Sequence, residues 1–468
     1  MSHSQPPSGP FGGPSPGGPP EGPGGGWAGG PASGPPGGGK SAAVLYRERV
    51  RRGRRGVLTT VVGLVLLGIC GLLIFGLYLA QFGVVGVTVG TLGALLPVGP
   101  VVAAFLWLDR WEPEPPRMLL IAFLWGACFA TLVALIFNSS AEAAAALAYG
   151  DDTGSTISAV FVAPWVEEAL KGSFLLGLLL FRRREFDGVL DGVVYAGVVG
   201  AGFAFTENIL YLGRAFADGV AGGGGEVLSV LILRGVISPF AHPLFTAMTG
   251  IALGIATNAR HLIVRLLLPV LGYLLAVLLH GLWNASGLLG GAGLIGIYVM
   301  VMLPIFFFVV AVVLYQRRRE QRIISAELPG FAAAGWIAPS EVGLLQSLAG
   351  RRGWLRAVRR RSGPEVARMV EQYQSAVTEL AILRHRMARG SLGTHARQWH
   401  DELLEEVLVS RALAVGSPDA LHAAWGRRTP PPGWLPPSPP APGDRDWPGQ
   451  GHRHAAAPGH PPFGSPLD

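Results

Sequence analysis

Long apolar runs recur through the middle of the chain and limit what it can fold into. About eight of them reach the length of about 20 residues that an α-helix needs to cross a bilayer. They lie at about 57–79, 84–108, 117–138, 157–181, 189–213, 227–257, 263–287 and 291–315. Half of all residues are hydrophobic and 14% are charged. The sequence therefore predicts an all-α, polytopic membrane helix bundle of about eight transmembrane helices.

Basic residues gather in alternate loops between these runs. Clusters at Arg182–Arg184 and Arg317–Arg319 lie on one predicted side of the membrane, whereas Asp151 and Asp152 lie on the other. Lys and Arg near the ends of membrane spans favour the cytoplasmic side. We therefore predict a multi-pass protein of the cell membrane with both termini in the cytoplasm. The net charge of +7 belongs to these loops and does not indicate a nucleic-acid-binding surface.

Composition divides the chain into four predicted segments. Residues 1–55 form a disordered Gly/Pro-rich tail that ends in a basic cluster, and residues 56–316 form the transmembrane domain. Residues 317–415 form a cytoplasmic helical segment, because apolar residues recur there at helical spacing. Residues 416–468 form a second disordered tail, which is rich in proline.

Three charged residues lie inside the apolar run at 157–181: Glu167, Glu168 and Lys171. A charged side chain at the centre of a membrane helix costs roughly 2.5–3.5 kcal/mol on insertion, so such residues usually face a polar interior and serve a function. Glu167 and Lys171 are at positions i and i+4, share one helix face and can pair. Glu168 points about 100° away from Glu167 and needs a partner from another helix.

Polar residues of a similar kind recur in the later runs. They are Glu207 and Asn208 in the fifth, Arg234 and His242 in the sixth, and His280 and Asn284 in the seventh. At a rise of about 1.5 Å per residue, Glu167, Glu207 and His280 reach similar depths below the outer surface. We therefore expect the acids and histidines to share one cavity in the outer half of the membrane. Pro239 and Pro243 also predict a break in the sixth run.

Carboxylates and imidazoles in one buried cavity support two mechanisms of hydrolysis. In the first, His242, His280 and Glu207 bind Zn²⁺ while another glutamate acts as general base. In the second, which needs no metal, a buried glutamate takes a proton from water while histidine and asparagine stabilise the oxyanion. Each residue also has a purely structural interpretation, such as an intrahelical ion pair or a contact between helices. The candidate catalytic residues are Glu167, Glu168, Glu207 and His280, supported by Lys171, Asn208 and Asn284.

Several short motifs follow one another along the chain. They are Asp109-Arg110-Trp111-Glu112-Pro113-Glu114-Pro115, Glu167-Glu168-x-x-Lys171, Asp187-Gly188-x-x-Asp191-Gly192, Phe203-x-x-x-Glu207-Asn208, His242 and His280-x-x-x-Asn284. In this order they resemble the PrsW family of intramembrane proteases, over about residues 90–315. That family belongs to a wider group with the CAAX prenyl endopeptidases and the bacteriocin-immunity-type membrane proteins.

The resemblance implies cleavage of a peptide bond in or near the bilayer. Its implied partners are the lipid bilayer and a membrane-anchored protein substrate, which for the type member of the family is an anti-sigma factor. It implies no nucleic acid and no small-molecule cofactor, and it leaves open whether Zn²⁺ takes part. Two other classes of function fit the same residues: a proton- or ion-coupled transporter, and a non-catalytic membrane immunity or scaffold protein. A proton relay would be expected to continue toward the cytoplasm, whereas these residues collect in the outer half of the membrane. The sequence therefore favours hydrolysis over transport.

Overall fold

The computed structural model describes residues 42–109, 114–183, 185–222, 225–390 and 396–416. Residues 62–468 form one compact unit and residues 1–61 another. Both predicted disordered tails fall largely or wholly outside the described residues, and so do Arg110–Pro113 of the first motif.

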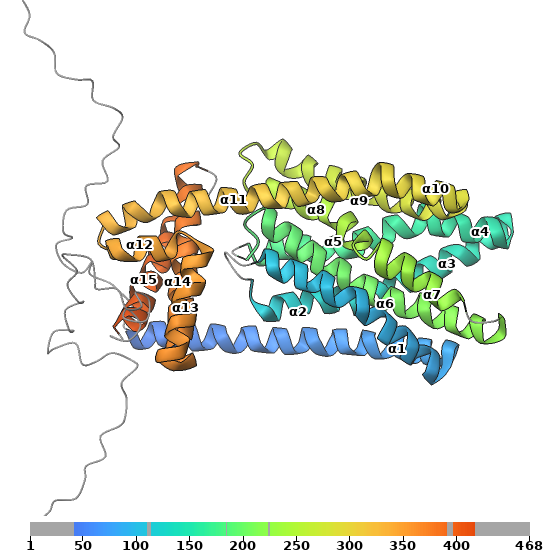
Figure 1. Ribbon diagram of the computed structural model, residues 1–468, viewed down its shortest axis with the longest axis horizontal. Helices are drawn as coiled ribbons and strands as arrows, with labels where there is room; N and C mark the ends of the chain where they lie inside the picture. The colour runs from blue at the N-terminus through green and yellow to red at the C-terminus, as the bar shows by residue number, and fades with distance from the viewer. Residues whose placement is uncertain (1–41, 110–113, 184, 223–224, 391–395, 417–468) are drawn as a thin grey trace, which may run out of the picture. The chain divides into compact units, whose positions relative to one another are not determined.

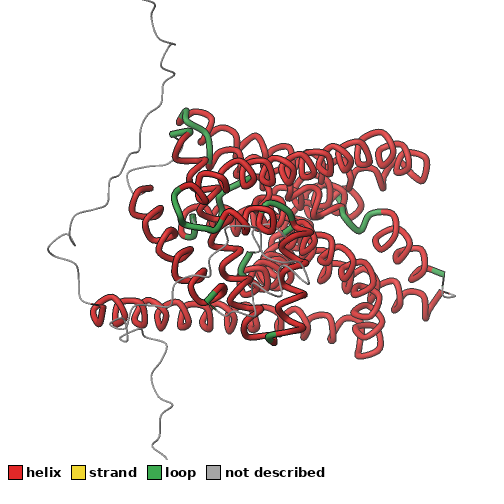
Figure 2. The backbone as a smooth tube through the Cα atoms, turned by 60° about the vertical axis from the view of Figure 1, so that its left-hand side comes forward, coloured by secondary structure: helices red, strands yellow, loops and turns green. Residues whose placement is uncertain are grey.

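The described residues form helices joined by short loops, and no strand occurs among them (Figure 2). The apolar part of the chain holds ten α-helices, several continued by short π-helical or 3-10 turns (Figure 1). They are α1 (Ala42–Leu108), α2 (Pro116–Leu124), α3 (Thr131–Tyr149), α4 (Asp151–Ile157), α5 (Ala163–Phe181), α6 (Val189–Gly222), α7 (Glu226–Leu231), α8 (Ala241–Thr257), α9 (Leu262–Ser286) and α10 (Gly290–Ile297). The prediction of an all-α polytopic membrane bundle is confirmed.

Within the described ranges, five continuous helical segments are long and apolar enough to cross a membrane. The first and the last of them run for 49 and 72 residues, well beyond one crossing. Gly83 (φ 68°) divides the first and Gly290 (φ 68°) divides the last, at positive φ values that glycine adopts without strain. The helix α5, with its three charged residues, is not among the five. The count of about eight crossings remains a prediction, and the positions of these breaks agree with it.

The predicted break in the sixth run is present in the structure. The helix α7 continues as a π-helical turn over Ile232–Ile237, and α8 begins at Ala241. Between them, the Ser238 amide donates to the Leu233 carbonyl and the chain turns at Pro239. The break places His242 in the first turn of α8, beside the helices that carry the acidic residues.

The helix α6 forms the centre of the bundle, since most of its apolar stretch is buried. It packs closely along α8. A Cβ atom at Gly192 would overlap the carbonyl oxygen of Gly250, and a Cβ atom at Gly250 would overlap that of Gly192. In a membrane the lipid tails are as apolar as the helix surfaces, so helices associate through close van der Waals packing. Small residues at a crossing allow the two backbones to approach closely enough for this packing. This packing fixes the rotation of α6 and α8, and therefore the directions of Glu207 and His242.

The last part of the described chain forms a second hydrophobic core. The helix α11 (Leu303–Ala333) leads into α12 (Pro339–Leu345), α13 (Leu348–Arg361), α14 (Gly363–Ala388) and α15 (Ala396–Val415). Trp354 and Tyr373 are fully buried in this core. Tyr373 donates its hydroxyl to Glu341 (2.6 Å), which also accepts from Arg411 (3.0 Å). The apolar stripe of residues 340–415 is therefore a packing surface.

Candidate active site

The helix α5 places three charged side chains in the interior of the bundle. Glu167, Glu168 and Lys171 are exposed by 5%, 0% and 0% of their surfaces. The Lys171 ammonium donates to Glu168 Oε1 (2.9 Å) and to Glu167 Oε2 (3.3 Å). Helical spacing brings Lys171 to both acids, at i+3 and i+4. Without the ammonium, two adjacent carboxylates at this depth would carry a prohibitive desolvation cost.

Contacts with the helices around α5 complete the surroundings of Lys171. Its Nζ lies 3.1 Å from His242 Nδ1 and 3.8 Å above the centre of the Phe203 ring. An ammonium has three N–H groups and no lone pair, so His242 Nδ1 is the acceptor in this contact. The three donors of Lys171 are therefore directed at Glu167, Glu168 and His242.

Glu168 is held on both of its carboxylate oxygens. Thr246 of α8 donates its hydroxyl to Oε2 (2.9 Å), and His280 Nδ1 of α9 lies 3.1 Å from Oε1. Because an ionised carboxylate only accepts hydrogen bonds, the proton of His280 resides on Nδ1. The other ring nitrogen, Nε2, then presents its lone pair toward Glu167 Oε2, 3.7 Å away.

A second carboxylate holds His242 in the same manner. His242 Nε2 lies 2.6 Å from Glu207 Oε2 on α6, which also accepts from the guanidinium of Arg234. Arg234 donates from Nε to Asn208 Oδ1 (2.6 Å) as well. Glu207 and Asn208 thus bind one arginine together, and the proton of His242 resides on Nε2.

Glu167, His242 and His280 offer three ligand atoms that all lie within 4.8 Å of one another. Two neutral imidazoles and one carboxylate form a ligand set of catalytic zinc sites. Each histidine also has its other nitrogen against a carboxylate, the arrangement that orients histidine ligands. These residues therefore fit a zinc ion by donor type. Ligation through His242 Nδ1 requires Lys171 to turn away from that nitrogen.

The structure brings together most of the residues proposed from the sequence. Glu167, Glu168, Glu207, His242, His280 and Lys171 form one buried cluster drawn from α5, α6, α8 and α9. The three residues close enough to share a metal ion are Glu167, His242 and His280, whereas the sequence predicted Glu207 with the two histidines. Asn284 has no described contact with the cluster, and its side chain donates to the Ala159 carbonyl (2.8 Å). That contact joins α9 to the segment before α5.

Sequence reasoning missed one side chain that touches the acids and assigned no site role to two others. Asn138 of α3 donates to Glu167 Oε1 (3.1 Å), and its own carbonyl accepts from Ser158 (3.0 Å). The second is Thr246, which holds Glu168, and the third is Arg234, which holds Glu207. Asn138 and Thr246 are uncharged and inexpensive to bury, so their presence in an apolar run gives little signal.

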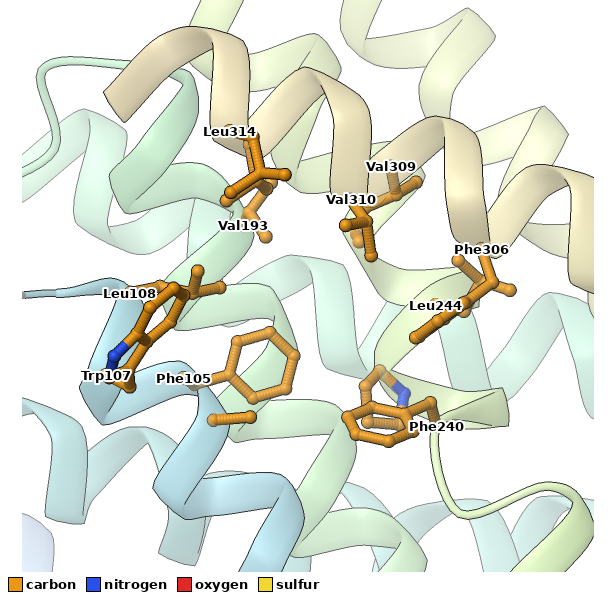
Figure 3. A pocket seen from close by; sticks show the side chains of 14 residues that line it. Phe105, Trp107, Leu108, Val193, Phe240, Leu244, Phe306, Val309, Val310 and Leu314 are labelled. Atoms are coloured by element: carbon orange, nitrogen blue, oxygen red, sulfur yellow. The ribbon is translucent and has the colours of Figure 1, made fainter. Parts of the chain in front are cut away.

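An apolar cavity of about 210 Å³ lies between the end of α1, the first turns of α6 and α8, and α11 (Figure 3). Pro243 and Leu244, which follow His242, form part of its wall. The end of α1 and the helix α11 form other parts, with Phe105 and Phe306 among the lining side chains. Its lining is almost wholly apolar, so the chemistry depends on the Glu/His cluster and not on this cavity.

Comparisons with known proteins show the family of this chain. Residues 114–313 match the model of a family described as "PrsW family intramembrane metalloprotease". Protease PrsW of Oceanobacillus iheyensis is 30% identical over 190 residues, which cover 40% of this chain and 79% of the relative. Protease PrsW of Geobacillus kaustophilus is 30% identical over 187 residues, covering 40% and 74%, and that of Clostridioides difficile is 28% identical over 193 residues, covering 41% and 76%. No solved structure matches the chain. On this evidence the chain belongs to the PrsW family of intramembrane proteases, and it is a multi-pass membrane protein.

Proposed function

We propose that this protein hydrolyses a peptide bond of a membrane-anchored protein at the Glu167/Glu168/His242/His280 cluster. One observation carries the proposal: carboxylates and imidazoles from four helices meet in hydrogen-bonding contact inside an apolar bundle. Groups this costly to bury are retained in membranes for chemistry or transport. Membership of a protease family decides between these two uses.

Glu167 is the proposed proton acceptor. From the described part of the chain, its Oε2 accepts only the 3.3 Å hydrogen bond from Lys171, whereas both oxygens of Glu168 accept hydrogen bonds of about 3 Å. A water molecule beside Glu167 Oε2 and His280 Nε2 meets two acceptors that orient it. Glu167 takes a proton from the water as its oxygen bonds to the carbonyl carbon, and returns that proton to the amine nitrogen as the C–N bond breaks. Glu168 acts through His280, whose Nδ1 proton it holds.

Positive groups in the cluster stabilise the negative charge that develops on the carbonyl oxygen. The Lys171 ammonium and the Arg234 guanidinium are fixed by the carboxylates that they contact. Charges that are already fixed in a site without bulk water need no reorganisation during the reaction. In this proposal His242 holds Lys171 and Glu207 in place, and Glu207 fixes Arg234.

If the enzyme works with zinc, Glu167, His242 and His280 are its proposed ligands. A bound zinc ion supplies Lewis acidity and lowers the pKa of a coordinated water. Proton acceptance would then pass to Glu168 or Glu207, the two carboxylates that orient the histidine ligands. The set Glu167, Glu168, Glu207 and His280 therefore remains the proposed catalytic set under both mechanisms, with Lys171 and Asn208 in support.

The proposal also covers the substrate, the membrane topology and the domain bounds of the protein. The substrate is a protein anchored in the membrane, with an anti-sigma factor as the specific candidate, cut in the outer half of the bilayer. Both termini lie in the cytoplasm, because the basic loops fall on one side of the predicted topology. Residues 56–316 form the protease domain, residues 317–415 form a cytoplasmic helical segment, and the wider relationship is to the CAAX protease group.

Co-expression with tagged single-span proteins from the same cell tests this function. Wild type is compared with Glu167→Gln and Glu168→Gln, and with Glu142→Gln as a matched control at an exposed acid. We expect a substrate fragment with wild type and with the control, and none with either site variant. Transport or scaffolding without proteolysis would give no fragment that depends on the two glutamates.

A further inference from the structure

A polar cavity of about 640 Å³ lies outside the active site, where the start of α6, the end of α8 and the middle of α11 meet the last turns of α14. Four arginines and two carboxylates line it: Arg260, Arg319, Arg386, Arg389, Asp187 and Glu320. The lining therefore has an excess of two positive charges. Because like charges around one cavity repel, such a set favours an anionic occupant.

Contacts within the lining leave most of the arginine charge available. Arg386 forms an ion pair with Asp187 (2.5 Å). Arg260 donates to the backbone carbonyl of Arg389 (3.1 Å from Nε), a contact that leaves its charge uncompensated. Among the described residues, no carboxylate lies within ion-pair distance of Arg260, Arg319 or Arg389. Three guanidinium groups can therefore turn to a ligand.

A histidine in the same lining has an unsatisfied nitrogen. His385 Nε2 is buried and has no hydrogen-bond partner among the described residues. Leaving a buried polar atom without a partner costs free energy, so each such atom in a folded protein calls for an explanation. A turn of the His385 ring that brings Nε2 to the cavity surface would let it donate to an oxygen-rich anion there.

The position of the cavity indicates the kind of anion. Gln316 and Arg319 follow directly after the apolar run that ends at Tyr315, and Asn258–Arg260 connect α8 to α9. The cavity thus lies at the end of the apolar helices, at the level of lipid headgroups.

We propose that this cavity binds a phosphate group, and that the phosphate belongs to an anionic phospholipid. Arg260, Arg319, Arg389 and His385 are the donors, and charge-assisted hydrogen bonds from arginine suit phosphate oxygens. Basic pockets at the cytoplasmic ends of membrane helices are a recurrent mode of headgroup binding. A headgroup here would join α11 and the α8–α9 loop to α14, which lies beyond the residues 114–313 matched by the family model.

Lipid retention by the purified full chain tests this proposal without any reference to proteolysis. The protein is placed in nanodiscs of phosphatidylcholine with or without phosphatidylglycerol, and bound lipid is counted by native mass spectrometry. The thermal unfolding midpoint is recorded in both lipids. The test variant is Arg319→Gln with Arg389→Gln, and the matched control is Arg359→Gln with Arg360→Gln, two exposed residues of α13.

We expect wild type and control to retain phosphatidylglycerol preferentially and to gain stability from it. The test variant should retain it about tenfold less well or worse, because two charge-assisted hydrogen-bond donors to the phosphate are lost. Arg319→Lys keeps the positive charge and should keep most of the phosphatidylglycerol retention. This variant therefore separates loss of the charge from a folding defect. If wild type, the test variant and the control retain phosphatidylglycerol equally well, the proposed binding site is overturned. Stabilisation by inorganic phosphate as strong as that by phosphatidylglycerol overturns the assignment to a lipid.

Discussion

Lys171 Nζ lies 2.9 Å from Glu168 Oε1, and both side chains are fully shielded from solvent. An ion pair of this kind on the surface contributes little to stability. In the interior, removal of one partner strongly destabilises the protein. The remaining charge would stay in a low-dielectric interior without compensation. The fold of the bundle and the chemistry of the site therefore depend on the same ammonium group.

Replacing Lys171 should destabilise the protein strongly. We expect Lys171→Met to lower the free energy of unfolding by about 3–5 kcal/mol, because Glu168 is left buried and unpaired. Unfolding in mixed detergent micelles, followed by circular dichroism, measures the change. Adding Glu168→Gln to Lys171→Met removes the orphaned charge and should recover a large part of the loss. A Lys171→Met protein as stable as wild type would show that the pair carries no such cost.

The contact between Gly192 and Gly250 predicts a sharp difference between glycines. Gly192→Ala and Gly250→Ala should each cost about 1–3 kcal/mol, because the added methyl group meets the carbonyl of the facing helix. Gly177→Ala in α5 is the matched control, since a Cβ atom there has no other atom within 4 Å. Its stability should stay equal or rise by up to about 1 kcal/mol. The same loss at all three positions would contradict close packing of α6 on α8.

Metal content should follow the proposed ligands. After purification with zinc and removal of excess ion, His280→Ala and Glu167→Ala should retain no stoichiometric zinc by elemental analysis. Glu207→Gln should retain zinc with roughly 10–100-fold lower affinity, because Glu207 orients His242 and is not itself a ligand. Asn284→Ala should bind zinc as wild type does. Retention by His280→Ala would exclude this ligand set, and the measurement does not depend on activity.

A buried acid outside the membrane spans predicts a pH dependence of stability. Burial raises the pKa of Asp109 from 3.8 to about 7, partly offset by the backbone N–H of Glu114, which donates to its Oδ2 (2.8 Å). Burial also raises the pKa of Glu114, whose Oε2 accepts from Tyr195 (2.8 Å). Between pH 3.8 and about 7 the folded protein keeps a proton on Asp109 that the unfolded chain has released. Stability should therefore fall as pH rises through this interval.

The variant Asp109→Asn should flatten this slope, because it removes the titrating group and keeps an oxygen that can accept the Glu114 amide. Thermal midpoints measured at a series of pH values would show the difference. Asp152→Asn, at an exposed position, serves as the control and should follow wild type. Identical slopes in wild type and Asp109→Asn would contradict the raised pKa.

Much of the site could be read from the sequence, because its most informative residues are expensive to bury. Glu167, Glu168 and Glu207 stood out in apolar runs, and helical spacing paired Glu167 with Lys171. The break before His242 followed from two prolines. Spacing alone could not show which neighbour a side chain meets. Asn284 shares a helix face with His280, yet its side chain donates to the Ala159 carbonyl in the segment before α5.

What the sequence could not provide is the rotation of each helix about its axis. That rotation is fixed by glycine contacts such as Gly192 with Gly250, which depend on the whole bundle. It brings Thr246 to Glu168 and Arg234 to Glu207. It also puts Glu167, rather than Glu207, with both histidines in the possible metal group.

Rates of substrate cleavage by purified protein in nanodiscs test the glutamate-dependent chemistry most directly. Wild type, Glu167→Gln, Glu168→Gln and the exposed control Glu142→Gln are compared at equal amounts of folded protein, with fragments identified by mass spectrometry. The control should cleave at the wild-type rate. Each site variant should be slower by about 10²–10⁴-fold, the usual contribution of a positioned general acid–base group. Cleavage at the wild-type rate by both site variants would contradict a catalytic role for this cluster.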